Sequence, residues 1–352
     1  MCLRLHKGLF TTLYWITFVP MKHISVLVPQ GSSIVDTIIS PFNLFKMANS
    51  YHQRLNGLSE PLYKIDLVGI DDKPVTYQGL FTVNPTASID SIEKTDLIII
   101  SPISGNLENG VKVNQKFVEW MKKQRIQNGT DLASLCRGAF LLAETGLVNG
   151  KDCATHWAAQ DLFKKWYPQV NLVAESIFCE SNGIYSSGGA YSILNFTLYL
   201  IERFFGRETA IWTSKLSEIE FDRISQSEFI IFSGQKDHSD ESVKSAQEFI
   251  ESNFENKLNV ETIAARVHLN ARSFLRRFKK ATSSTPLEYI QRVRVEAAKK
   301  KLESSTDTIM EVMFAVGYSD EKAFRNIFRK YSGLSPKEYQ MKYNREIAFA
   351  SI

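Results

Sequence analysis

The segment between Val260 and Tyr339 contains two copies of one pattern, and this repeat constrains the fold more than any other feature. Fifty residues separate Phe274, Phe278, Lys280, Pro286, Glu288 and Tyr289 from Phe324, Phe328, Lys330, Pro336, Glu338 and Tyr339. Upstream the offset is forty-nine, relating Val260, Ile263, Val267 and Leu269 to Ile309, Val312, Val316 and Tyr318. Because a turn tolerates a one-residue slip and a helix does not, we predict turns near residues 269 and 319. Each copy is therefore expected to be a helix-turn-helix.

The second helix predicted in the first copy, residues 270–281, combines an apolar stripe with a cationic face. Phe274 and Phe278 are four residues apart and share one side of the helix. The remaining sides carry five cations, namely Arg272, Arg276, Arg277, Lys279 and Lys280. Arg side chains can hydrogen-bond guanine edges in a major groove, and Lys side chains can contact phosphates. A solvated basic face explains one such helix equally well, but two copies at matched spacing favour DNA binding.

A single helix is predicted between the copies, from Pro286 to Glu303, with Thr285 as its N-cap. Its eighteen residues span roughly 27 Å, close to the ~34 Å turn of B-DNA. Both cationic helices could therefore enter successive major-groove segments on one face of the duplex. The predicted DNA-contacting residues are Arg272, Ser273, Arg276 and Lys279 in the first copy and Lys322, Arg325 and Asn326 in the second.

The C-terminal region resembles the AraC family of transcription regulators over about a hundred residues. The residues that carry the resemblance are Ile263-Ala264, Ser273–Phe278, Thr285–Tyr289, Val316–Asp320, Ala323–Arg325 and Gly333–Pro336. It implies double-stranded DNA as a partner and allows contact with RNA polymerase. One departure is the segment Gln340–Tyr343, because the family usually places an arginine after the tyrosine.

From Met21 to about Phe205, short apolar strands alternate with helical patterns. This alternation predicts an α/β domain with a doubly wound, flavodoxin-like parallel sheet, ahead of an all-α domain with two helix-turn-helix motifs. The predicted strands are Ile24–Val28, Tyr63–Val68, Leu97–Ser101, Asp131–Leu135 and Ile184–Ser187. The predicted helices are Pro41–Arg54, Val113–Gln127, Gly138–Thr145, Ala158–Lys165 and Ser192–Phe205.

A sharp strand-to-helix turn is predicted at Cys136, where a strand ends and a helix begins at Gly138. Such a turn exposes a nucleophile at a helix N-terminus, where the helix dipole lowers the pKa of a thiol. His156 follows twenty residues later and could act as the base of a nucleophilic pair. An isolated cysteine after a strand is, however, more often a small buried apolar residue.

A second resemblance covers about residues 22 to 205 and is carried by Cys136–Ala143, Thr145–Gly150 and Ala154–Trp157. These segments resemble the PfpI-type, glutamine-amidotransferase-like domain, and the combination with an AraC-type tail resembles the GlxA-like regulators. In enzymes of that superfamily the cysteine is the nucleophile, a histidine is its base, and an acidic residue near the first helix assists.

The sequence departs from those enzymes where the assisting acid is expected. No glutamate follows the first strand, Asp36 is an uncertain substitute, and Asn195 stands where these regulators often carry aspartate. We therefore expect no enzymatic activity and regard Cys136 and His156 as vestigial.

A small-molecule pocket is the expected use of this region. Its predicted ligand-binding residues are Gly105, Cys136, Arg137 and His156. Backbone N–H groups near Arg137 and Gly105 would be available to an anionic ligand group.

Charge and cysteine usage agree with a two-part chain. Residues 241 to 352 carry 20 Lys and Arg against 14 Asp and Glu, a net charge of +6, which leaves 22 against 24, a net of −2, for residues 1–240. The predicted parts are an N-terminal extension at 1–20, a sensing domain at 21–205, a connector at 206–240 with a hinge at Lys236–Asp240, and a DNA-binding domain at 241–345. The four cysteines show no zinc or disulfide spacing, so no metal or cofactor is expected.

The run from Leu9 to Pro20 is too short to span a bilayer, so no membrane association is predicted, and Met21 is an alternative start. The favoured hypothesis is a cytoplasmic, dimeric transcription regulator that senses a small-molecule effector. The alternatives are an active cysteine-dependent amidase, peptidase or aldehyde-processing enzyme with a DNA-binding tail, and a front domain that only dimerises.

Overall fold

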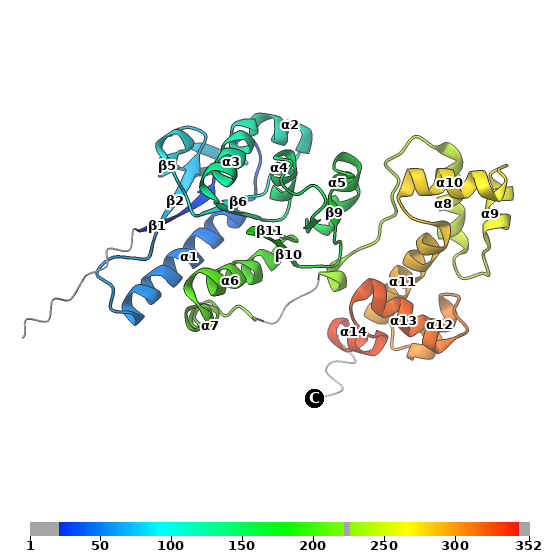
Figure 1. Cartoon of the computed structure of the whole chain (residues 1–352). Coiled ribbons are helices and arrows are strands. Elements are labelled where there is room, and N and C mark those ends of the chain that lie inside the picture. The colour runs from blue at the N-terminus through cyan, green and yellow to red at the C-terminus, as the bar shows by residue number, and fades with distance from the viewer. Residues whose placement is uncertain (1–20, 222–225, 345–352) are drawn as a thin grey trace, which may run out of the picture.

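A mostly parallel sheet of seven strands organises the N-terminal half of the chain (Figure 1). The computed structural model describes residues 21–221 and 226–344, so the extension predicted at 1–20 lies outside the described residues. The strand order is β10-β11-β7-β6-β1-β2-β5, and β10 runs antiparallel to β11. The strands are β1 (Lys22–Leu27), β2 (Tyr63–Gly69), β5 (Ala87–Ser88), β6 (Leu97–Ile100), β7 (Asp131–Ser134), β10 (Phe178–Ser181) and β11 (Ile184–Ser187).

The topology of this sheet determines where a ligand can bind. Leaving aside β5 and β10, the parallel strands are ordered 2-1-3-4-5 along the chain, which is the flavodoxin-like doubly wound order. The chain leaves β1 for β2 on one side and later returns to place β6 on the other. In such sheets ligands bind beyond the carboxyl ends of the strands, at this switch point. The predicted fold class of this half is confirmed.

Helices cover both faces of the sheet, because its central strands are apolar on both sides. In β6, Leu97 and Ile99 pack in the core beneath α1 (Asp36–Leu55) and α6 (Ser192–Phe205). Ile98 and Ile100 pack in the opposite core, beneath α3 (Gln115–Asn128) and α4 (Gly138–Glu144). All four side chains are fully buried, which is why this strand reads as a continuous apolar run.

Each of the five predicted strands is present, with ends that differ by at most two residues. The first helix differs more, since α1 begins at Asp36 and encloses Pro41, which was expected to start it. Elements that the sequence did not predict are β3 (Val75–Tyr77), β4 (Phe81–Val83), β5, β8 (Asp152–Cys153), β9 (Asn171–Leu172), β10, α2 (Leu107–Val113) and α7 (Arg207–Leu216).

The C-terminal half is helical and contains two separate cores. One core holds Phe274 and Phe278, and the other holds Phe324 and Phe328. The long helix α11 contributes to both, so it joins the two units rigidly. The helices are α8 (Glu241–Asn253), α9 (Val260–Arg266), α10 (Ala271–Thr282), α11 (Pro286–Ser304), α12 (Ile309–Ala315), α13 (Glu321–Ser332) and α14 (Pro336–Tyr343).

The region predicted as a connector, residues 206–240, consists of two different parts. Its first part forms α7, which packs on α1 and α6 and stacks Trp212 on Tyr51 with ring centroids 4.2 Å apart. Its last part, residues 226–240, lies between the two halves and is called the strap below (Figure 1). The strap contacts the second half through Lys299 of α11, whose Nζ donates to the carbonyl of Ile230 at 2.6 Å.

The C-terminal end of the strap, predicted as a hinge, is bound to the helical half. Lys236 pairs with Glu251 of α8 at 2.7 Å. Asp240 caps α8 and also accepts two hydrogen bonds from the Arg277 guanidinium, at 2.6 and 2.8 Å. These contacts make Lys236–Asp240 part of the helical domain's own surface.

Candidate DNA-contacting surface and ligand cavity

The two helix-turn-helix units are built in the same way. In the first, the Asn270 side chain caps α10 by accepting from the N–H of Ser273 at 2.9 Å. In the second, the Asp320 side chain caps α13 by accepting from the N–H of Ala323 at 2.6 Å. The preceding helices α9 and α12 end at Arg266 and Ala315, so the turns lie where the change of offset predicted them. Both units are helix-turn-helix motifs.

The helix between the units, α11, begins as predicted. The Thr285 hydroxyl accepts from the N–H of Glu288, and the Glu288 carboxylate accepts from the N–H of Thr285. This reciprocal pair fixes the first turn of the helix. With nineteen residues, α11 ends at Ser304, one residue beyond the prediction.

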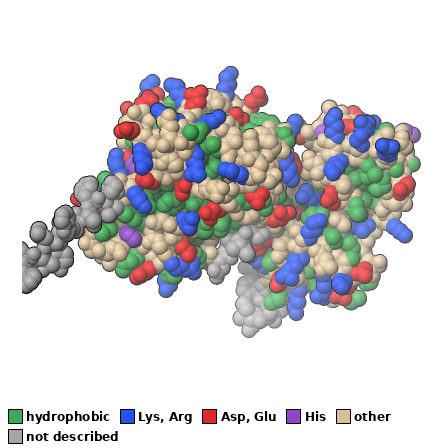
Figure 2. All heavy atoms as spheres, viewed as in Figure 1, with side chains coloured by type: hydrophobic (Ala, Val, Ile, Leu, Met, Phe, Trp, Pro, Cys, Tyr) green, Lys and Arg blue, Asp and Glu red, His purple; other side chains and the backbone are tan. Residues whose placement is uncertain are grey.

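The structure places most of the predicted DNA-contacting side chains on exposed helix faces. Arg272, Arg276 and Lys279 are exposed on α10, whereas Ser273 is half-buried. Lys322, Arg325 and Asn326 are exposed on α13. Figure 2 shows Lys and Arg side chains gathered over α10. Whether these residues touch DNA stays a prediction.

Two of the cations on these helices have carboxylate partners that the sequence did not reveal. Arg277 of α10 is bound by Asp240 of the strap, so its guanidinium is used within the domain. Arg325 of α13 is paired with Glu321 of the same helix, with Nη2 2.5 Å from Oε1. Since this second pair is exposed, it holds the Arg325 side chain only weakly.

The turn around Cys136 depends on Cys136 and Gly138 in different ways. Cys136 itself, and not Gly138, has the left-handed backbone conformation, with φ +53°. Gly138 is needed for a different reason, because a Cβ at that position would lie 2.3 Å from the carbonyl oxygen of Ile100. The tight turn therefore depends on a strained cysteine and on close contact between two backbone segments.

A cavity of about 560 Å³ opens beyond the carboxyl ends of the central strands. It is lined by segments that follow β1, β6, β7 and β11, as the topology of the sheet requires. Cys136, Arg137 and His156 all line it, whereas Gly105 does not. The remaining lining residues are Ile34, Asp36, Thr37, Ser40, Leu107, Ala158, Ala159, Leu162, Ala190, Tyr191, Ile193 and Leu194. The walls are mainly apolar, with one guanidinium and one carboxylate.

The electrostatics of the cavity do not activate Cys136. Burial raises the pKa of the Cys136 thiol and outweighs the opposing hydrogen bonds and charge of Arg137. The predicted lowering of the pKa by the helix dipole is therefore wrong, since α4 has only seven residues and the thiol is almost fully buried. Burial, assisted by the charge of Arg137, lowers the pKa of His156, so the imidazole is neutral at pH 7.

His156 is held in place by contacts with its own turn and with Gly189. Its Nδ1 accepts from the N–H of Ala158 at 3.0 Å and caps the short 3-10 helix η2 (Trp157–Ala159). Its ring lies against Gly189, where a Cβ would come within 1.7 Å of Cδ2. Among the described residues, no hydrogen bond joins the Cys136 sulfur to His156 or Asp36. The arrangement can bind a small molecule.

A buried glutamine of the strap lies behind the cavity wall. The Gln226 amide, 4 % exposed, donates to the carbonyls of Thr155, Ala174 and Ser176 at 3.2, 3.0 and 3.2 Å. Thr155 directly precedes His156, and its hydroxyl donates to the carbonyl of Cys136 at 3.0 Å. No local sequence signal distinguished Gln226, because its partners come from two distant segments, at Thr155 and at Ala174–Ser176.

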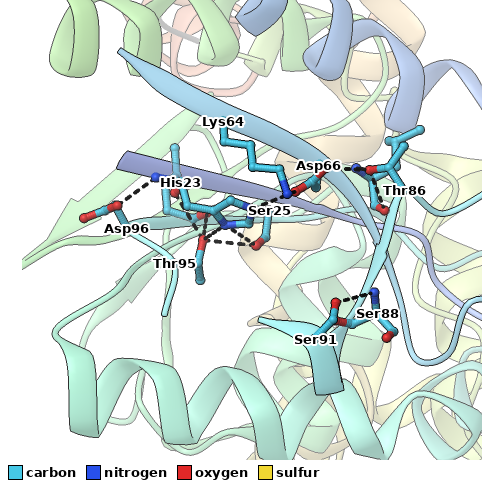
Figure 3. Close-up of polar contacts among 11 residues, drawn as sticks. His23, Ser25, Lys64, Asp66, Thr86, Ser88, Ser91, Thr95 and Asp96 are labelled. Carbon is cyan, nitrogen blue, oxygen red and sulfur yellow. Dashed lines mark hydrogen bonds and ion pairs between the residues drawn. The ribbon is translucent and has the colours of Figure 1, made fainter. Parts of the chain in front are cut away.

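A second polar cluster, at the opposite end of the sheet, resembles a catalytic arrangement only superficially (Figure 3). His23 Nδ1 lies 3.3 Å from the Ser25 hydroxyl, and Nε2 lies 3.0 Å from Asp66. Ser25 is completely buried, so no substrate can reach it. Asp66 also pairs with Lys64 at 2.8 Å, and the cluster fixes β1 to β2.

The described residues contain neither a metal-binding cluster nor a membrane-spanning helix. Within residues 21–221 and 226–344, no three His, Cys, Asp or Glu side chains are grouped so as to hold a metal ion. In the same part of the chain, no helix has both the length and the apolar character needed to cross a bilayer.

Comparisons with known families agree with the two halves. The DJ-1/PfpI family matches residues 25–203, and a helix-turn-helix domain family matches residues 263–342. The HTH-type transcriptional regulator GbdR of Pseudomonas aeruginosa is 24 % identical over 310 residues, 87 % of this chain and 83 % of that protein. The HTH-type transcriptional regulator CdhR of the same organism is 25 % identical over 313 residues, 89 % of each chain.

Among solved structures, a candidate transcriptional regulator from Vibrio parahaemolyticus is similar to the α/β half. The two share 23 % identity and a TM-score of 0.50, over 56 % of this chain and 99 % of that one. At this identity the likeness supports the fold alone.

Proposed function

The chain belongs to the DJ-1/PfpI family, and we propose that it is a sequence-specific transcription regulator with an AraC-type DNA-binding domain and an effector-binding α/β domain. The observation that carries this proposal is the pair of equivalent helices α10 and α13, which are capped alike and expose cations. The similarity to GbdR and CdhR, both named transcriptional regulators, supports it over nearly the whole chain. If the chain acts as these bacterial regulators do, we expect it to work in the cytoplasm, where the DNA lies.

The cavity at the sheet's switch point is the proposed effector site. Its apolar walls suit a small metabolite, and the half-buried guanidinium of Arg137 suits a carboxylate. Asp36, at the start of α1, offers a partner for a nitrogen cation on the same ligand. We therefore expect a small nitrogenous or carboxylate-bearing molecule, bound by Arg137 with Cys136 and His156 beneath it.

The effector acts on transcription by binding one arrangement of the protein better than another. Two chains are expected to pair through their α/β domains, because paired half-sites strengthen control. RNA polymerase is a further expected partner of the DNA-bound dimer.

DNA binding is tested with the full chain and a pool of random duplexes, followed by footprinting on an enriched sequence. Arg276→Ala should cost about 1–3 kcal/mol of binding free energy and relax specificity in one part of the site. Lys122→Ala, which removes an exposed cation of α3 in the other domain, is the matched control and should leave binding unchanged. Unaltered footprints for both Arg272→Ala and Arg276→Ala would show that this face of α10 does not contact DNA bases.

The enzymatic alternative is tested with Cys136→Ser. Because the thiol is buried and its pKa is raised, we expect wild type and variant to bind DNA equally and neither to turn over amide, peptide or aldehyde substrates. Turnover by the wild type that disappears in the variant would establish the enzyme instead.

A further inference from the structure

The internal repeat makes one half of the DNA-binding domain a built-in comparison for the other. Residues 272, 275, 276, 279 and 280 are exposed on α10, and their equivalents 322, 325, 326, 329 and 330 are exposed on α13. The buried aromatic residues, the N-caps and the capping boxes that follow also correspond. Positions that are equivalent in the two helices therefore have equivalent access to a bound duplex.

Some of these equivalent positions carry the same type of side chain in both helices, and others carry different types. Lys279 and Arg329 are both cations, as are Lys280 and Lys330. Cations at fixed positions suit contacts to phosphate, which is the same at every step of DNA. By contrast, Arg276 corresponds to Asn326, and Leu275 corresponds to Arg325. Side chains that differ at equivalent positions are suited to reading bases, because the two groove segments offer different base edges.

Exposure decides which side chains of each helix can reach a duplex. Arg276 takes part in none of the ion pairs found among the described residues, and its side chain is exposed. Arg325 and Asn326 are both exposed, and the exposed pair between Arg325 and Glu321 holds that guanidinium only weakly. At the equivalent positions 276 and 326, the first unit therefore presents a guanidinium and the second presents a carboxamide.

We propose that the two recognition helices read different bases, with Arg276 of α10 selecting guanine and Asn326 of α13 selecting adenine. This inference rests on the proposed function. An arginine donates two hydrogen bonds to O6 and N7 of guanine, and an asparagine bonds to N6 and N7 of adenine. Leu275, 40 % exposed beside Arg276, adds an apolar surface suited to a thymine methyl group. The binding site is therefore asymmetric within each chain, with a guanine in one major-groove segment and an adenine in the next.

The test is selection of binding sites from random duplexes by the wild type, Arg276→Asn, Asn326→Arg and the double exchange. Each matched base should be preferred about 5- to 150-fold over the others. Asn326→Arg should change the preferred base from adenine to guanine in one segment and leave the other unchanged. The double exchange should select a site with the two preferences in reversed order. Because both positions are exposed, circular dichroism should show unaltered helix content and thermal stability.

Lys279→Asn and Arg329→Asn are the matched controls, since both positions carry cations in wild type. Each should weaken binding to all sequences and reduce the salt dependence of affinity by about one ion, without changing base preference. The proposal is overturned if the wild type selects the same base in both segments, or if the exchanges leave the selected site unchanged. If the wild type enriches no sequence at all, the proposed function itself fails.

Discussion

Substituting Gly188 by alanine tests how tightly the strap is held in the α/β domain. A Cβ on residue 188 would lie 2.7 Å from Oε1 of Gln226 and 2.9 Å from its Cδ. The Gln226 amide cannot simply move aside, because three carbonyls surround its nitrogen and the side chain is 4 % exposed. We therefore expect Gly188→Ala to expel the amide and deprive the carbonyls of Thr155, Ala174 and Ser176 of this donor, of which, among the described residues, only that of Ala174 keeps a second donor, from Gln160.

The magnitude follows from the bonds that are lost. The amide has two protons to share among the three carbonyls, so two hydrogen bonds are lost at about 1–1.5 kcal/mol each. Gly188 does not have a positive φ, so alanine restricts the unfolded chain and returns about 0.4–1 kcal/mol. The free energy of unfolding should therefore fall by roughly 2 kcal/mol, a net of the two effects.

Urea unfolding followed by tryptophan fluorescence measures this change in the relevant domain, because all five tryptophans precede the strap in the sequence. Gln226→Ala is the second arm of a double-mutant cycle. In that background the new methyl group meets no amide, so Gly188→Ala should be neutral or stabilising by up to about 1 kcal/mol. An equal loss of stability in both backgrounds would refute the proposed contact.

Three other outcomes are expected. Phe324 has a fully buried ring, so Phe324→Ala should lower the free energy of unfolding of the helical domain by about 3–5 kcal/mol in urea melts followed by circular dichroism. The control is Leu287→Ala, at a side chain that is 61 % exposed, which should change this free energy by less than about 0.5 kcal/mol. Burial alone would raise the pKa of Asp66, but hydrogen bonds from Lys64, His23 and Thr86 lower it below the usual 3.8. The wild type should therefore lose stability as the pH falls below about 4. Asp66→Asn should make the free energy of unfolding less dependent on pH in this range. Burial raises the pKa of Cys136, and it raises the pKa of Cys153 to about 12 and that of Cys179 to about 11. All three thiols should therefore react with iodoacetamide far more slowly than free cysteine at pH 7, as measured by mass spectrometry of the digested protein. Rapid alkylation of Cys136 would instead reveal a thiolate.

The sequence predicts the parts of this fold that local patterns specify. The five main strands are short runs of mostly buried residues, and the two helix-turn-helix units repeat each other, so each of these patterns can be recognised in the sequence by itself. Strands such as β8, β9 and β5 have two residues each and exist only through pairing with distant segments. The prediction for the start of α1 is wrong because proline is common in the first turn of a helix, whereas Pro41 lies five residues inside α1.

The candidate cavity was predicted only in part for a similar reason. Cys136, Arg137 and His156 come from one contiguous match, and the fold brings all three to the same cavity. Tyr191 and Leu194 reach it from α6 and its preceding turn, through the order of the strands. The pKa of Cys136 depends mainly on burial. The sequence places the thiol at a helix N-terminus but does not show how deeply it is buried.

The strap also determines where this protein can be divided. Phe232 packs on Tyr289 with ring centroids 5.2 Å apart and belongs to the first core of the helical domain, although it precedes α8. The buried ammonium of Lys299 donates to the carbonyl of Ile230 as well as to the carboxylate of Glu296. A fragment that begins at Glu241 would therefore expose the first core and lose one of the two acceptors of Lys299 and the carboxylate that binds Arg277. A chimera that joins this DNA-binding domain to a different sensing domain must keep the chain from Ile230 onward. The new sensing domain must also contain a site that binds the residue standing in place of Gln226.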